Sequence, residues 1–397
     1  MKRFVVLSLT ILIVISTTAC SYTKYLSGRD TESANFCGTP DNQLILPIAK
    51  ETFTTKLMNE MPQDENFVIS PLSIKLAMSL AAVGATGDTQ SEILKSIQVD
   101  SIEDLANSAK DLIYDNNGVE IANSVWLNTS RQHGVMFDQG FEKFLTEDFD
   151  AKFGLVTDET AVNTINSWVS EKTHSKIPTI VDEPDFVAAL INAIYFNQEW
   201  KQEFNGDTNF DMTFNNADGT TSEIKAMSTR INTNFYNNGS VRIVEIPYAK
   251  GDLSMYLVLT NGHNIDIKPY LTRMQKKEVK IMMPKFKMEF SQHLIPVFKE
   301  LGVQKAFIPG EATFDDMLNK PEDLYISDII HKAYIDVNEK GTEAAAATAV
   351  LTDKNAIDPG EEEIVELFLA NSPFSFYIIN NSSEEILFAG NYKTANK

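Results

Sequence analysis

The feature that most constrains the fold is a nearly unbroken apolar run from Ala189 to Phe196, which reads ALINAIYF. A β-strand that is buried on both faces of its sheet has this composition. The run therefore predicts a sheet with packed layers on both sides. A chain of 397 residues, 43% of them hydrophobic, is long and apolar enough to build such a core.

Regular patterns elsewhere in the chain predict a mixed fold. Ala49, Phe53 and Leu57 recur every four residues and indicate a helix, and Ser73 to Val83 indicates a second, buried helix. Extended segments are predicted at Asn66 to Ser70, Val119 to Leu127, Val241 to Pro247, Leu253 to Leu259, Val279 to Phe290, Phe374 to Ile379 and Ile386 to Tyr392, the last two forming a hairpin across Asn380 to Glu385. No repeat or linker interrupts these patterns, so we expect one α+β domain over residues 44–397.

An excess of acidic residues excludes some partners. Lys and Arg number 34 against 55 Asp and Glu, giving a formal net charge of -21. Proteins that hold nucleic acid neutralise its phosphates with Lys and Arg, and a basic patch is also what docks on anionic lipid. We therefore expect no nucleic-acid partner and no electrostatic docking on a membrane.

The N-terminus has the layout of a secretory signal. Lys2 and Arg3 precede an uncharged, mostly apolar stretch that ends in small residues at Ala19. This predicts a signal peptide over residues 1–19 that directs secretion across the inner membrane, followed by a polar tether over residues 20–43.

The pair Ala19-Cys20 resembles the end of a bacterial lipobox, although Thr17 stands where that motif usually carries Leu. One expectation is therefore a lipoprotein held by a lipidated Cys20 at the cell envelope or cell surface. The alternative is cleavage after Ala19 and free secretion.

Motifs for catalysis or for metal and cofactor binding do not occur in the sequence. There is no GxSxG elbow, phosphate-binding loop or dinucleotide fingerprint, and none of the five histidines lies in an HExxH pair. The two cysteines, Cys20 and Cys37, precede the region that reads as folded, so no thiolate metal site is expected. We expect a protein that is not an enzyme and has no metal ion or cofactor.

One segment, VNEKGTEAAAATA from Val337 to Ala349, permits two interpretations. Helix propensity favours a surface helix capped by Thr342, but that helix would have no apolar stripe to pack. In an extended conformation the small side chains could slide between two strands, with Gly341 as a backbone hinge and Thr342, Ala344 and Ala346 on one face.

The segment resembles the hinge of the reactive-centre loop in the serpin family, and the resemblance runs from about residue 44 to residue 393. It is carried by eight segments in order, namely NFVISPLSIKLAMSLAAVGATGDT (66–89), INSWVSEKTHSKI (165–177), LINAIYFNQEW (190–200), VEIPYAKGDLSMYLVL (244–259), MPKFKMEF (283–290), LGVQKAF (301–307), LYISDIIHKAYIDVNEKGTEAAAATA (324–349) and FLANSPFSFYI (368–378). It implies a serpin fold, with a large central sheet, further sheets, surrounding helices and an exposed reactive-centre loop at about 338–367.

The resemblance also implies a function. An inhibitory serpin is a metastable, monomeric suicide substrate of serine proteases, and in some cases of cysteine proteases. The target cleaves the loop and forms an acyl-enzyme, and the freed hinge then inserts into the central sheet. The small residues of the hinge favour this interpretation, and the alternative is a non-inhibitory serpin that acts as a binding or chaperone-like module.

Individual residues acquire roles through the resemblance. The hinge comprises Glu339, Gly341, Thr342, Ala344, Ala345, Ala346, Ala347 and Thr348. Ser70, Ser73, Asn192 and His331 resemble the shutter, a polar cluster behind the central strands. Trp200 resembles the aromatic residue of the breach, where insertion begins, and plain core packing is the alternative for it.

The position of the reactive bond has more than one solution. Counting from Gly341 along the usual loop length places it between Asn355 and Ala356, and a shift of one residue places it between Lys354 and Asn355. The chain after the bond is longer than usual and acidic over residues 358–366, which suggests either a solvated linker or electrostatic steering of a basic protease.

Overall fold

The computed structural model describes residues 51–104, 106–107, 118–205, 209–319, 323–342 and 365–395. These residues belong to one compact unit, Ala49–Lys397. The described ranges include the helices α1 (Phe53–Glu60), α2 (Pro71–Gly84), α3 (Gly87–Ser96), α5 (Gln139–Phe149), α6 (Ala161–Lys172), α7 (Lys268–Leu271) and α8 (Ile295–Glu300), and the 3-10 helix η1 (Lys305–Phe307).

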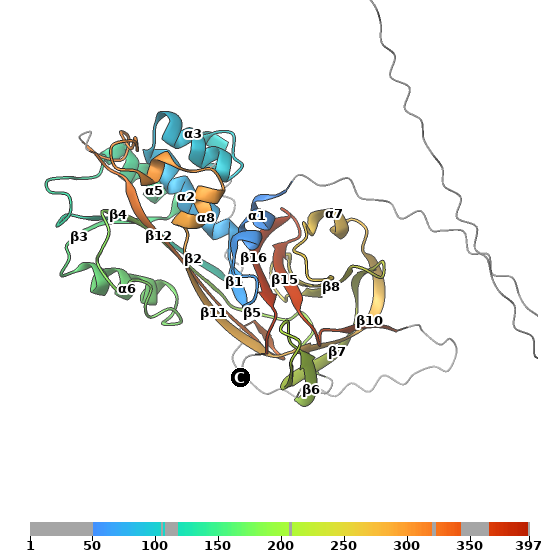
Figure 1. Ribbon diagram of the computed structural model, residues 1–397. Coiled ribbons are helices and arrows are strands. Elements are labelled where there is room, and N and C mark those ends of the chain that lie inside the picture. Colours follow the sequence, from blue (N-terminus) through green and yellow to red (C-terminus); the bar gives the residue numbers. More distant parts are fainter. Residues whose placement is uncertain are drawn as a thin grey trace, which may run out of the picture. The chain divides into compact units, whose positions relative to one another are not determined.

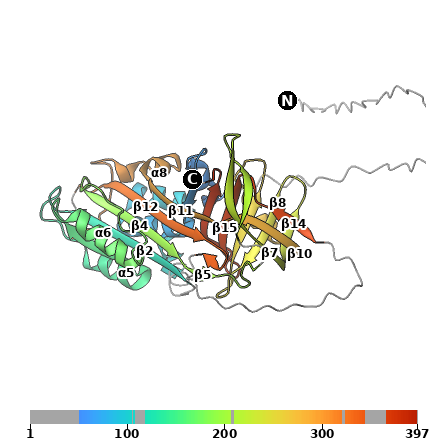
Figure 2. The same cartoon turned by 90° about the horizontal axis from the view of Figure 1, so that it is seen from below.

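Seven of the described strands form one sheet, which we call the seven-stranded sheet. Its strands are β2 (Val119–Asn128), β3 (Lys152–Val156), β4 (Ala188–Phe196), β5 (Gln198–Glu199), β11 (Phe286–His293), β12 (Ile326–Val337) and β13 (Gly341–Thr342). They follow the order β3-β2-β4-β12-β13-β5, and β11 pairs with the other edge of β12. Figure 2 shows β2, β4, β12 and β11 lying side by side.

A second sheet is built from nine of the described strands. They are β1 (Phe67–Ile69), β6 (Phe210–Asn215), β7 (Thr221–Asn237), β8 (Arg242–Pro247), β9 (Leu253–Leu259), β10 (Gln275–Pro284), β14 (Glu366–Leu369), β15 (Phe374–Asn380) and β16 (Glu385–Tyr392). Their order is β1-β16-β15-β9-β8-β7-β10-β14, with β6 paired to β7.

The apolar run from Ala189 to Phe196 lies in strand β4, and all nine residues of that strand are buried. Leu190 and Ile194 pack into the cluster that contains α2, whereas Ile191 and Ala193 pack into a second cluster with α6. The two helices therefore cover opposite faces of the seven-stranded sheet (Figure 1). The predicted sheet with packed layers on both sides is confirmed.

Most predicted elements are confirmed within a few residues, but one prediction was wrong. The expected strand Val279 to Phe290 is two strands, β10 in the nine-stranded sheet and β11 in the seven-stranded sheet, with Lys285 between them. Pro284 ends β10 because proline has no N–H to give to a ladder. The apolar alternation changes phase at this point, from Val279, Ile281 and Met283 to Phe286 and Met288, so the pattern carries a mark of the change that a single predicted strand does not account for.

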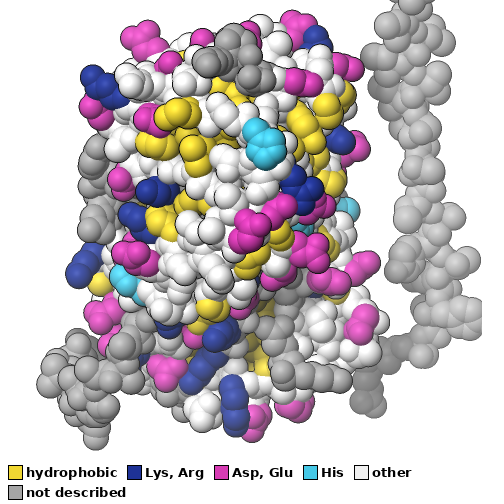
Figure 3. All heavy atoms as spheres, turned by 90° about the vertical axis from the view of Figure 1, so that its left-hand side faces the viewer, with side chains coloured by type: hydrophobic (Ala, Val, Ile, Leu, Met, Phe, Trp, Pro, Cys, Tyr) yellow, Lys and Arg dark blue, Asp and Glu magenta, His cyan; other side chains and the backbone are white. Residues whose placement is uncertain are grey.

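The acidic surplus is spread over the surface that Figure 3 shows, which is the left-hand side of Figure 1. Asp and Glu side chains are distributed over that face, several of them close together to the right of its centre, and Lys and Arg side chains lie among them. No helix within the described ranges is long and apolar enough to span a membrane.

Candidate functional site

The strands β4 and β12 pair directly, in parallel, from Ala188 with Ile326 to Ile194 with Ala333. Beyond that point β13 lies next to β12 and leads to β5 in the order of the sheet. We call the direct pairing of β4 with β12 the seam. Its open end lies at Thr342, and its far end lies at Ala188 and Ile326.

Strand β13 is antiparallel to both of its neighbours at the open end. Thr342 pairs with Val337 of β12 and with Gln198 of β5. The Thr342 side chain is fully buried, and its Oγ1 lies 2.7 Å from the hydroxyl oxygen of Tyr248. Since side chains alternate along a strand, a continuation of β13 would turn the even-numbered residues to the inner face.

Gly341 is required by close packing. A Cβ atom at this position would lie 2.1 Å from the carbonyl oxygen of Gln198. The predicted role of this glycine is backbone freedom, and the structure shows a second reason for it, the close approach of β13 to β5.

Trp200 combines core packing with contacts to the turn between β12 and β13. It is 2% exposed, and its ring stacks on Tyr248 with centroids 4.5 Å apart. The indole Nε1 donates to the carbonyl oxygen of Asn338 at 2.9 Å, and the backbone N–H donates to that of Lys340 at 2.9 Å. Both interpretations of this residue thus agree with its surroundings, and its role in insertion remains a prediction.

Glu339 fastens the same turn to neighbouring elements. Its carboxylate forms an ion pair with the Lys285 Nζ at 3.0 Å. Its carbonyl oxygen accepts a hydrogen bond from the Phe204 backbone N–H at 2.8 Å. The turn is therefore held from two sides before Gly341 starts β13.

The four residues assigned to the shutter lie together beneath the seam. Ser70 caps α2, because its Oγ accepts from the Ser73 N–H at 3.1 Å. The Asn192 side-chain amide donates to the Ser73 carbonyl oxygen at 3.0 Å and contacts the Ser73 hydroxyl. Its Nδ2 also lies 2.5 Å from Asn123 Oδ1. Asn123 is a member that the sequence analysis missed.

His331 completes this cluster as a neutral imidazole. Its Nδ1 pairs with Asn192 Oδ1, and its Nε2 accepts from the Ser70 backbone N–H at 3.2 Å. Complete burial lowers the pKa of His331 to about 3. A proton on Nε2 would face the Ser70 N–H, so charging the ring would break this contact.

The buried imidazole makes stability depend on pH. The folded protein keeps His331 neutral down to a pKa of about 3, whereas the unfolded chain binds a proton below about 6.5. Stability is therefore lost as the pH falls below 6.5. Between pH 7 and pH 5 we expect this residue to reduce the free energy of unfolding by about 2 kcal/mol. Urea titrations at both pH values would measure the loss, and equal pH slopes for wild type and His331→Gln would contradict it.

Several predicted residues lie outside the described ranges. They are Cys20, the hinge residues Ala344, Ala345, Ala346, Ala347 and Thr348, and the reactive-bond residues Lys354, Asn355 and Ala356. Tyr248, which contacts Thr342, was missed by the sequence analysis. The two residues are 94 positions apart, and no local pattern marks a lone Tyr as the partner of a distant Thr.

The fold and the site define an α+β protein whose central sheet carries the first residues of an additional strand at the open end of a seam. The sequence model of a family described as serpin (serine protease inhibitor) matches residues 49–394. The chain belongs to the serpin family.

Similar proteins cover almost the same span. The leukocyte elastase inhibitor of Xenopus tropicalis is 30% identical over 365 residues, which is 85% of this chain and 95% of that protein. Serpin48 of the insect Tenebrio molitor is 29% identical with a TM-score of 0.74, covering 87% of this chain and 96% of its own. Tengpin, a thermophilic serpin in the native state, is 27% identical with a TM-score of 0.76, covering 86% and 92%. The predicted serpin fold is confirmed.

Proposed function

We propose that this serpin inhibits serine proteases as a suicide substrate. The observation that carries the proposal is the strand begun at the open end of the seam. Gly341 and Thr342 already lie beside β12 and β5, while β4 and β12 pair directly along the rest of the seam. The sheet can accept a further strand there once the chain that follows Thr342 is released from its other attachment, β14.

The chemistry is that of an interrupted peptide hydrolysis. The protease serine oxygen attacks the carbonyl carbon of the residue before the reactive bond, and the amine of the following residue leaves with a proton. The resulting ester would be hydrolysed by water if the protease kept its geometry. Insertion of the freed hinge carries the protease toward the far end of the seam and distorts its oxyanion hole before that hydrolysis occurs.

Insertion supplies enough free energy for this distortion. Residues 343–354 would gain backbone hydrogen bonds to strands on both sides, whereas Thr342 is already paired. At about 1 kcal/mol net per bond, these twelve residues contribute on the order of 10 kcal/mol. That exceeds the few kcal/mol that a packed active-site loop typically contributes to a protein of marginal stability.

The direct test is the formation of a covalent adduct. We expect incubation with a trypsin-like, an elastase-like or an Asn-cleaving serine protease to give an adduct that survives SDS. The mass of the C-terminal fragment, separated under denaturing conditions, distinguishes cleavage after Asn355 from cleavage after Lys354. A cysteine protease in the same assay tests that further class through a thioester adduct.

A second outcome would favour the alternative function. Clean cleavage by every protease, with no adduct, would make the chain a substrate and support a non-inhibitory binding or chaperone-like module. The small side chains of Ala344 to Ala347 speak against that outcome, because they place no charge on the inserting segment.

We also propose that the protein is bacterial, exported, and anchored in the cell envelope through a lipid on Cys20. The support is the signal-like stretch that ends in Ala19-Cys20. Labelling of cells with radioactive palmitate should mark the wild type and leave Cys20→Ser unlabelled. Label on neither protein would leave free secretion as the explanation.

A further inference from the structure

We propose that Ser327 acts as a latch at the far end of the seam and controls the last stage of strand insertion. The proposal rests on the proposed function, since it concerns how far the freed hinge travels. Ser327 is a positioning residue in this role, because its contacts are with Val187 and Ala188 and it does not contact the protease.

Ser327 bridges the two strands of the seam where their regular pairing fails. The register shifts between Ile326 and Asp328, so Ser327 is an extra residue of β12 without a ladder partner. Its hydroxyl oxygen accepts from the Val187 backbone N–H at 2.7 Å and donates to the Ala188 carbonyl oxygen at 3.2 Å. The side chain thus replaces the missing backbone bonds at the start of β4.

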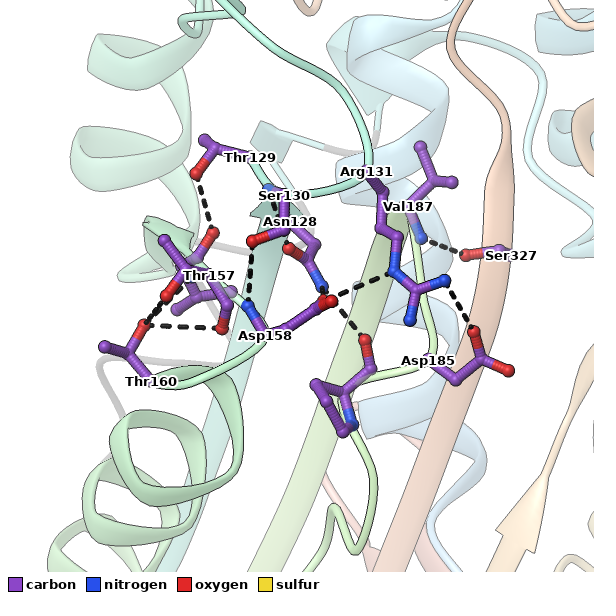
Figure 4. A network of polar contacts seen from close by, with 12 residues as sticks. Asn128, Thr129, Ser130, Arg131, Thr157, Asp158, Thr160, Asp185, Val187 and Ser327 are labelled. Atoms are coloured by element: carbon purple, nitrogen blue, oxygen red, sulfur yellow. Dashed lines mark hydrogen bonds and ion pairs between the residues drawn. The ribbon is translucent and has the colours of Figure 1, made fainter.

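A polar brace holds the segment that contains Val187 in place (Figure 4). The Asn128 backbone N–H donates to the Val187 carbonyl oxygen, and its side-chain amide donates to the Pro184 carbonyl oxygen, both at 2.9 Å. Arg131 forms ion pairs with Asp158 and Asp185, both at 3.2 Å. The brace fixes Val187 from the β2 side, so the latch joins β12 to a supported segment.

The register at the open end predicts when an inserting strand reaches the latch. Thr342 lies between Val337 of β12 and Gln198 of β5, which are 139 residues apart in the sequence. Asp328 and Ala189, which pair directly in the seam, are also 139 residues apart, so the same register holds along its length. Each residue after Thr342 would therefore lie beside residues one position earlier in the sequence on both neighbouring strands. Residues 343–351 fill the seam as far as Asp328 and Ala189.

Thr352 is the first inserting residue that reaches the latch. It is ten residues after Thr342, and the residues ten positions before Val337 and Gln198 are Ser327 and Ala188. The last residues before the reactive bond can enter only after the Ser327 hydroxyl has released Val187 and Ala188. Insertion should accordingly have an early stage that is independent of Ser327 and a late stage that depends on it.

Pulsed hydrogen exchange on the full chain after addition of trypsin would resolve the two stages. The early stage is the protection of amides in residues 343–350, and the late stage is the protection of residues 352–354. For Ser327→Ala we expect the late stage to be about thirtyfold faster, because neither of the two hydrogen bonds of the Ser327 hydroxyl then has to break. The early stage should keep its wild-type rate.

Ser327→Thr is the matched control, because it keeps the hydroxyl, and its late stage should stay within about twofold of the wild type. Acceleration of both stages by Ser327→Ala would show general loosening of the sheet and overturn the latch. An unchanged late stage would also overturn it while wild-type insertion upholds the proposed function. A wild type that is cleaved without protection of either segment overturns the proposed function and the latch together.

Discussion

A single cut between Val350 and Ile357 is expected to raise the temperature of unfolding by about 14 °C. The freed segment can then continue β13 along the seam and add backbone bonds worth on the order of 10 kcal/mol. The shift in unfolding temperature is this free energy divided by the unfolding entropy, which is about 2.1 cal/mol/K per residue. For the family match of about 350 residues, the shift is ~14 °C. A cut in an ordinary loop gives no such gain, because it only increases the freedom of the chain.

Calorimetry of the intact and the nicked protein would measure this shift. Gel electrophoresis under denaturing conditions must show one cut, and native electrophoresis must show that both fragments stay together. Superimposable unfolding curves would mean that the uncleaved fold stores no free energy for insertion, and the inhibitor proposal would then fail.

The second large effect is expected from Ala344→Arg, which should lower the yield of covalent adduct more than tenfold while cleavage continues. By the register of Thr342, residue 344 would enter the seam level with Ile335 and Phe196, both fully buried. An unpaired guanidinium in that core costs several kcal/mol, so insertion becomes slower than hydrolysis of the ester. The protein then behaves as a substrate.

Glu343→Arg is the matched control, because residue 343 is already charged and would face the opposite side of the sheet, level with Asp336. Its adduct yield should stay near that of the wild type on SDS gels. Equal losses of adduct yield in both variants would show that the buried side chain of Thr342 does not predict which inserting residues face the inside of the sheet. Nicked Ala344→Arg should also lack the increase in unfolding temperature.

Prediction from sequence succeeded where a signal is local. The hairpin of β15 and β16 and the buried strands β4 and β9 follow from short apolar runs and alternation, and the structure confirms them. The polar cluster around Asn192 came from the family resemblance, since four polar residues scattered over more than 260 positions form no pattern of their own. Asn123 completes that cluster and carried no signal at all.

The amino-acid sequence by itself determined the layered α+β class, the family, and the small side chains of Ala344 to Ala347, which would allow the hinge to enter a sheet. Only the tertiary structure decided that Thr342 is already buried beside Tyr248, that the chain changes sheet at Lys285, and that Ser327 closes the far end of the seam. The physical reason is that helix and strand patterns arise from neighbours along the chain. A hydrogen bond between residues 94 or 140 positions apart exists only after folding has brought their strands together.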